Sequence, residues 1–250
     1  MKIKFKKILI ILTLVILSIT GCSSNTNDNN KSGNSKDKED SIKVVTSFYP
    51  MYLLASNVVK DIDNVELINM TNSATGCLHD YSLTTDNIKL LEDCDVFIIN
   101  GAGMESFLDK VLEQKPDLKI IDASEGIELI KSDYMDESHN HDHGHDHDEE
   151  YNPHVWLSVE NAIKQVENIE NKLIEYNSIN KDKYSQNARE YIEQLSNLDN
   201  KIHSELDNIK NKNIVTFHEA FPYFAKEYGL NIVEKSVLVI LNKVSKGKLK

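Results

Sequence analysis

Cysteine and positive charge are both scarce in this sequence of 250 residues. It contains three cysteines, and Cys94 begins an apolar run, where we expect a buried small hydrophobic side chain. The sequence does not decide whether Cys77 and Cys94 form a disulfide, because nothing in it brings these two residues together. Asp and Glu number 40 against 28 Lys and Arg, which gives a formal net charge of −12. That acidity argues against nucleic acid and anionic lipid as partners, and it is compatible with attracting cations.

No apolar run is long enough to span a membrane. The uncharged run "ILIILTLVILSIT" has 13 residues, whereas a transmembrane helix needs about 20 apolar residues. It follows the basic segment "MKIKFKK" and ends at "ITGC", an arrangement that predicts a signal peptide over residues 1–21. Small residues before Cys22 resemble the lipobox of bacterial lipoproteins. We therefore expect a lipid on Cys22 that anchors the chain to the cell membrane, on its extracytoplasmic side.

Hydrophobic residues are absent from residues 23–40, "SSNTNDNNKSGNSKDKED". Such a segment cannot offset the entropy cost of ordering by burying apolar surface. We therefore expect a disordered tether over residues 22–40, which separates the anchor from a globular part that begins at Ser41.

Short apolar segments alternate with helical patterns from Ser41 onward. The expected strands are "KVVTSF", "VELIN", "DVFIIN" and "KIID". The expected helices are "MYLLASNVVKDI", "TTDNIKLLED" with Thr84 or Thr85 as its cap, and "MESFLDKVLEQ" after a turn at Gly101. This alternation predicts an α/β fold with parallel sheets flanked by helices. Such sheets bind ligands in the loops at the carboxyl ends of their strands.

A long helix is expected to divide the globular part. Apolar residues recur at spacings of three and four from Tyr184 to Ile209, which favours an amphipathic helix of about 28 residues, roughly 42 Å long. We expect a rigid backbone helix over residues 179–210, with an N-terminal α/β lobe over residues 41–178 and a partial second lobe over residues 211–250. The other interpretation of this pattern is a helix that pairs with a partner in a coiled coil.

Five of the nine histidines fall within one acidic segment, "ESHNHDHGHDHDEE", residues 137–150. They are His139, His141, His143, His145 and His147. No apolar residue in the segment could pack it into a fixed shape, and a selective metal site needs rigid ligands. We therefore expect this histidine-rich loop to capture divalent metal weakly, while the selective site lies elsewhere.

Three further histidines lie in loops or turns, where an α/β protein holds its ligand. His79 follows the strand "VELIN" in "TGCLHDYSL", His154 lies in "YNPHVWLS", and His218 ends the strand in "IVTFHEAF". The remaining histidine, His203, lies within the long helical pattern. Each of the three alone would more often be structural. Together, in an acidic chain with a histidine-rich loop, they form a candidate metal site.

These segments resemble a known family, the zinc-binding lipoproteins that serve ABC importers, within the metal-specific class of solute-binding proteins. The resemblance covers residues 43 to about 233, in the family's order: "VVTSFYPMYLLASNV", "HDYSL", "DVFIINGAGMESFLDKVL", the histidine-rich loop, "NPHVWLS", the long helix and "VTFHEAFPYFAKEYGL". It implies two α/β lobes joined by a rigid helix, with Zn²⁺ as the transported ligand held by His79, His154 and His218. It also implies a monomer that delivers zinc to a membrane permease and is not an enzyme.

Two features depart from the family pattern. Position 78 is Leu, where some relatives of the family carry a Glu that can act as a fourth ligand. Cys77 is then the candidate for a fourth ligand that lies close in sequence to His79, because a thiolate binds zinc well. After "GLNIV" the chain reads "EKSVLVILNKVSKGKLK". We therefore expect an incomplete second lobe with an atypical tail.

Other functions fit part of the pattern. A surface lipoprotein that buffers metal without delivering it, or a truncated receptor without function, would fit an incomplete second lobe. A zinc hydrolase would need a placed general base besides its three histidines. "HEAF" supplies Glu219, but there is no HExxH motif, because Pro222 stands three residues beyond Glu219. Enzymatic activity is therefore not expected.

Overall fold

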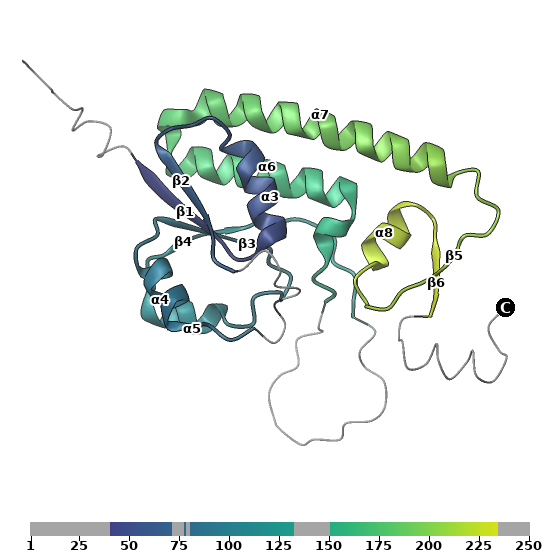
Figure 1. Ribbon diagram of the computed structural model, residues 1–250, viewed down its shortest axis with the longest axis horizontal. Helices are drawn as coiled ribbons and strands as arrows, with labels where there is room; N and C mark the ends of the chain where they lie inside the picture. The colour runs from purple at the N-terminus through teal and green to yellow at the C-terminus, as the bar shows by residue number, and fades with distance from the viewer. Residues whose placement is uncertain (1–40, 72–77, 79–80, 133–150, 235–250) are drawn as a thin grey trace, which may run out of the picture. The chain divides into compact units, whose positions relative to one another are not determined.

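Four parallel strands form the sheet of the first lobe (Figure 1). The computed structural model describes residues 41–71, 78, 81–132 and 151–234. The strands are β1 (Ile42–Thr46), β2 (Val65–Asn69), β3 (Val96–Ile99) and β4 (Lys119–Asp122). They lie in the order β2-β1-β3-β4, and each pair is parallel. Parallel neighbours need crossover connections, which the helices between the strands supply. The predicted parallel sheet is therefore confirmed.

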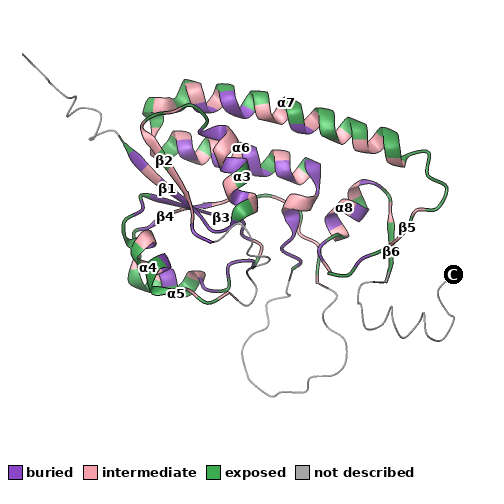
Figure 2. Cartoon of the chain, in the orientation of Figure 1, coloured by how far each residue is buried: buried purple, intermediate pink, exposed green. Residues whose placement is uncertain are grey.

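The two central strands form the core of the sheet. All of β3 is buried, and in β1 only Lys43 is not. A strand covered on both faces is a continuous apolar run, and "VFII" in β3 is such a run. Cys94, two residues before β3, is buried as predicted. It is a free thiol, and burial raises its pKa to about 11. Figure 2 shows this buried core between helices whose outer faces are exposed.

Helices lie on both sides of this sheet in Figure 1. They are α3 (Tyr49–Val58), α4 (Thr85–Glu92), α5 (Leu108–Gln114) and α6 (Val159–Tyr176). Helix α3 packs on β1 and β2, and α6 packs on β4 and on α3. Helix α4 begins at a capping box, in which Thr84 Oγ1 accepts the Asn87 N–H and Asn87 Oδ1 accepts the Thr84 N–H. Of the two predicted caps, Thr84 is the one used.

The long helix α7 (Lys181–Leu206) packs along α6 and α3 of its own chain. It is shorter than the expected range 179–210, because Ser178–Asn180 forms a 3-10 turn and the chain leaves the helix after Leu206. Its apolar stripe is buried near its start, whereas Leu198 is 45% exposed. In the part of the chain that the structure describes, no helix is both long and apolar enough to cross a membrane.

In the described residues, a strand–helix–strand segment follows α7. It consists of β5 (Asn213–Val215), α8 (Pro222–Glu227) and β6 (Asn231–Glu234), with β5 and β6 paired in parallel. Helix α8 contacts η1, a 3-10 helix at Val155–Leu157. All described residues belong to one compact unit. The packing of α8 on η1 therefore brings the loop after β5 against the turn before η1.

Candidate metal centre

His154 and His218 meet where the segment after α7 packs on the first lobe. Their Nε2 atoms lie 3.0 Å apart, and their ring planes are inclined at 85°. His154 immediately precedes η1, and His218 lies in the loop after β5. The two residues are 64 positions apart in sequence, so the fold rather than the local chain brings them together. The structure thus unites two of the three predicted ligands.

The first of these ligands is held in a fixed orientation. His154 is 2% exposed, and its ring packs against Trp156 with the centroids 5.3 Å apart. Trp156 in turn meets Phe48 edge to face at 5.1 Å, which connects this turn to the end of β1. Pro153 restricts the backbone immediately before the histidine. His154 therefore presents its Nε2 from a rigid position.

Asn152 contacts the other ring nitrogen of His154. Its Oδ1 accepts the backbone N–H of His154 at 3.1 Å and lies 3.0 Å from His154 Nδ1. Its Nδ2 donates to the carbonyl oxygen of Glu219 at 2.7 Å. Because Glu219 directly follows His218, this one side chain touches the backbone or ring of both segments that carry the paired histidines.

A loop at the carboxyl end of β3 supports the turn that carries the buried histidine. Asn100 Nδ2 donates to the Pro153 carbonyl at 2.9 Å, and Asn100 Oδ1 accepts from Gln165 Nε2 of α6 at 3.0 Å. Gly101 has a φ of +78°, and a Cβ at this position would come within 2.0 Å of Asp122 Oδ1. Glycine is therefore required at the point where the loop turns.

Glu105 accepts three hydrogen bonds inside the same loop. Its Oε1 accepts from Ser47 Oγ at 2.7 Å and from the Asn100 N–H at 2.8 Å, and its Oε2 accepts the Gly101 N–H at 3.0 Å. The side chain is almost completely buried. Burial raises the pKa of this carboxyl to about 7, against the lowering effect of the three donors. Glu105 thus ties together the carboxyl ends of β1 and β3.

His79 lies outside the described residues, but residues on both sides of it are placed. Leu78 is fully buried, and its N–H donates to Met104 Sδ at 3.3 Å. The Tyr81 N–H donates to the Leu78 carbonyl at 3.0 Å, and the Met104 N–H donates to the Gly101 carbonyl at 3.1 Å. The chain directly before His79 is therefore anchored to the loop that supports the His154 turn.

The remaining predicted metal-binding and lipidation residues also lie outside the described residues. They are Cys22, Cys77, His139, His141, His143, His145 and His147. Among the residues that are described, no group of three or more His, Cys, Asp or Glu side chains is arranged to hold a metal ion. The described part of the candidate site is therefore a pair of imidazoles.

Tyr223 of α8 fastens the second segment to the first lobe. Its hydroxyl donates to the Asn152 carbonyl at 2.7 Å and accepts the Ile130 N–H at 3.0 Å. The ring is buried, with 3% of the residue exposed. Since α8 follows the His218 loop within a few residues, these bonds help to fix where His218 stands relative to His154.

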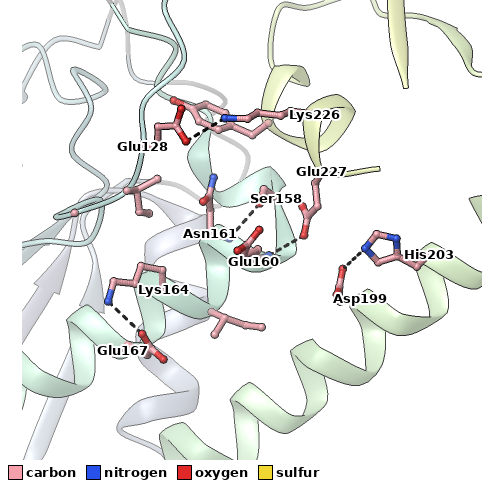
Figure 3. A pocket seen from close by; sticks show the side chains of 14 residues that line it. Glu128, Ser158, Glu160, Asn161, Lys164, Glu167, Asp199, His203, Lys226 and Glu227 are labelled. Atoms are coloured by element: carbon pink, nitrogen blue, oxygen red, sulfur yellow. Dashed lines mark hydrogen bonds and ion pairs between the residues drawn. The ribbon is translucent and has the colours of Figure 1, made fainter. Parts of the chain in front are cut away.

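A groove of about 890 Å³ lies beside this junction, and neither of the paired histidines lines it (Figure 3). Glu227 of α8 points from it to the start of α6, where its carboxylate accepts the N–H groups of Val159 and Glu160, both at 2.9 Å. Ser158 Oγ accepts the next N–H, that of Asn161, at 3.1 Å. The first turn of a helix has N–H groups without internal partners and favours negative charge. Glu227 therefore binds α8 to α6.

Two imidazole nitrogens at this separation suit zinc. Zinc takes nitrogen ligands at ~2.0–2.1 Å in tetrahedral sites, which places two such nitrogens about 3.3 Å apart. The 3.0 Å between the two Nε2 atoms is close to that value, so a small opening of the pair admits the ion. His154 is buried whereas His218 is exposed, so an ion can reach the pair from the His218 side.

Several residues of the site carry no metal-ligand signal in the sequence. Asn152 stands two residues before His154 in "NPHVWLS", and Asn100 and Glu105 flank the Gly101 turn in "NGAGME". Each of the three also bonds to a residue far away in the chain, at up to 67 positions for the bond from Asn152 to Glu219. Only the folded structure reveals what these residues hold.

Known proteins that are similar to this chain are named for zinc uptake or zinc binding. The family model described as zinc-uptake complex component A periplasmic, ZnuA, matches residues 44–246. The high-affinity zinc uptake system protein ZnuA of Bacillus subtilis is 34% identical over 228 residues, which span 90% of this chain and 69% of that protein. The zinc-binding lipoprotein AdcA of Streptococcus pneumoniae is 35% identical over 236 residues, which span 93% of this chain and 44% of that protein.

A solved structure of a relative has a fold similar to that of this chain. The Zn(II)-bound ZnuA-like domain of Streptococcus pneumoniae AdcA matches with a TM-score of 0.68 and 30% sequence identity, over 84% of this chain and 76% of that one. The chain therefore belongs to the ZnuA family of periplasmic components of zinc uptake complexes. The resemblance seen in the sequence is confirmed, and so is the α/β fold class. These relatives are named for zinc binding or zinc uptake and not for an enzymatic activity, in agreement with the expectation that the chain is not an enzyme.

Proposed function

We propose that this chain is the extracytoplasmic receptor of an ABC-type zinc importer. It captures Zn²⁺ with His79, His154 and His218 and delivers the ion to the membrane permease. A lipid on Cys22 anchors it to the cell membrane after removal of the signal peptide, and it acts as a monomer. The histidine-rich loop, residues 137–150, gathers zinc near the site without forming part of it.

The observation that carries the proposal is the pairing of His154 Nε2 with His218 Nε2 at 3.0 Å. Nitrogen ligands favour zinc over manganese or magnesium, which prefer oxygen. The anchoring of Leu78 to Met104 supports His79 as the third ligand, because it ties the preceding residue to the loop behind His154. The zinc named in the relatives agrees with this donor set.

Two experiments test the proposal. Calorimetric titration of the full chain with Zn²⁺ should detect one tight site, which disappears in His79→Ala, His154→Ala and His218→Ala. A strain that depends on this chain as its only zinc receptor should grow in zinc-limited medium, and it should fail with His154→Ala. Tight zinc binding without rescue of growth would contradict delivery, whereas a tight site that survives all three substitutions would contradict the ligand assignment.

A further inference from the structure

The side chain of Asn152 contacts both of the segments that carry the histidine pair. Its Oδ1 faces the backbone N–H and the Nδ1 of His154, at 3.1 and 3.0 Å, and its Nδ2 donates to the Glu219 carbonyl at 2.7 Å. The residue is 2% exposed. Within the interior, water cannot replace such bonds, so their geometry is fixed by the protein.

The orientation of the Asn152 amide follows from its backbone partners. A carbonyl oxygen can only accept, so the atom facing Glu219 O has to be the NH₂ group. A backbone N–H can only donate, so the atom facing His154 N has to be the oxygen. Reversing the amide would oppose two acceptors at one end and two donors at the other. The two ends therefore define the same orientation independently.

This orientation selects the tautomer of His154. Since Asn152 Oδ1 is an acceptor, the Nδ1 that lies 3.0 Å from it has to carry the proton. The Nε2 of the neutral ring is then left with its lone pair, directed at His218. In the 3.0 Å contact between the two Nε2 atoms, His218 is consequently the donor.

We propose that Asn152 is a positioning residue for zinc binding, which holds His154 in the Nδ1–H tautomer and ties the His218 loop to it through Glu219. The inference rests on the proposed function, because it takes His154 and His218 as zinc ligands. Zinc binds the lone pair of a neutral imidazole, so a preset tautomer removes a step from binding. The amide bond to the Glu219 carbonyl restrains the approach of the second ligand.

The side chain of Asn152 can be tested apart from its backbone. The backbone N–H of Asn152 donates to the Ile130 carbonyl at 2.8 Å, and its carbonyl accepts from Tyr223 at 2.7 Å. Both bonds survive any substitution of the side chain. Asn187 is the matched control, because it is also buried and its Nδ2 also donates to backbone carbonyls, those of Val58 and Lys60.

The experiment combines a spectroscopic and a thermodynamic measurement on the full chain. Long-range ¹H–¹⁵N correlation spectra of zinc-free protein, at a pH where the rings are neutral, should show His154 protonated on Nδ1 and His218 on Nε2. Asn152→Ala should lose this preference at His154 and bind Zn²⁺ roughly 10–100-fold more weakly. Asn152→Asp keeps an acceptor for Nδ1 but opposes an oxygen to the Glu219 carbonyl. It should therefore keep the tautomer and still lose affinity, while Asn187→Ala changes neither.

Each outcome bears on one of the two claims. A wild-type His154 protonated on Nε2 overturns the inference, and this holds even if Asn152→Ala does not fold. Unchanged zinc affinity in both Asn152 variants also overturns it, while leaving the proposed function intact. If the tight zinc site of the wild-type chain does not require His154, the proposed function is contradicted instead. The tautomer of His154 is measured without zinc, so it still decides whether Asn152 sets the protonation of the ring.

Discussion

His154 and His218 differ in burial, so we expect their substitution to lower the free energy of unfolding by different amounts. Removing the buried ring of His154 leaves space beside Trp156, so His154→Ala should lower both zinc affinity and the free energy of unfolding. His218 is exposed as a residue, although its ring contacts that of His154, so His218→Ala should lower the unfolding free energy by less than His154→Ala does. Both should weaken zinc binding by more than the roughly 100-fold that loss of a supporting hydrogen bond can cost. Zinc calorimetry and urea unfolding in chelator measure the two quantities.

His203 is the matched control for these two substitutions. It lies on α7, with Nε2 3.6 Å from Asp199 and its ring against Tyr228, and it lines the groove that neither of the paired histidines lines. His203→Ala should leave the zinc affinity unchanged. An equal loss of zinc affinity in this variant would contradict the assignment of the site to His154 and His218.

Glu105 should make the stability of the protein fall as pH rises. Burial raises its folded-state pKa from 4.5 to about 7, so between these values the folded chain holds a proton that the unfolded chain has lost. The contribution of Glu105 is therefore fully present below about pH 4.5 and is lost as pH rises through about 7. Glu105→Gln cannot ionise, so its unfolding free energy should vary less over this range. Urea unfolding of both proteins at pH 5 and pH 8, in chelator, measures the difference; equal pH slopes would contradict it.

At the scale of elements, boundaries were predictable where the chain itself signals them. Strands β2 and β4 coincide with "VELIN" and "KIID". Helix α3 begins at Tyr49, earlier than expected, because Pro50 suits the first turn of a helix. Helix α5 begins at Leu108, later than expected. Met104 and Glu105 lie in the preceding loop, where Met104 accepts a hydrogen bond from Leu78 and Glu105 accepts hydrogen bonds from the ends of β1 and β3. Tertiary hydrogen bonds of this kind leave no local pattern in the sequence.

The cap that α8 provides for α6 predicts the effect of substituting Glu227. Its carboxylate accepts the first two N–H groups of α6, and loss of an N-terminal cap costs about 0.5–2 kcal/mol. Glu227→Ala should therefore lower the unfolding free energy by about this amount. Lys226→Ala removes an ion pair to Glu128 in which both side chains are more than half exposed, and such pairs contribute about 0–1 kcal/mol. Urea unfolding of both variants compares them; a larger loss in Lys226→Ala would contradict the account.

At the scale of the whole molecule, the sequence predicts candidate ligands but not the residues that hold them in place. The histidines stand out in the sequence because of their residue type and their positions in loops or turns. Asn152, Tyr223 and Glu227 do not stand out, because each acts through contacts with residues more than 60 positions away. Composition and motif therefore identify candidate ligands, while the residues that hold two of these candidates together are found only from the packing of one segment on another.

Deletion of residues 137–150 should separate the two kinds of zinc binding. The Lys131–Tyr151 bridge and the bond from the Asn152 N–H to the Ile130 carbonyl hold the flanking chain together. We therefore expect the shortened protein to fold and to keep one tight zinc site, while the weaker sites disappear. Calorimetric titration of both proteins checks this, and loss of the tight site on deletion would contradict the assignment of the loop to metal capture.

The proposed zinc site is a set of imidazoles that contains His154 and His218. X-ray absorption at the zinc edge reports the ligands of the bound ion, and it should be measured on the protein that lacks residues 137–150 and is loaded with a single equivalent of zinc. We expect three imidazole nitrogens at ~2.0–2.1 Å, and the loss of two of them when both His154 and His218 are replaced by Ala. A zinc shell of oxygen ligands alone, or a shell that the double substitution leaves unchanged, would contradict it.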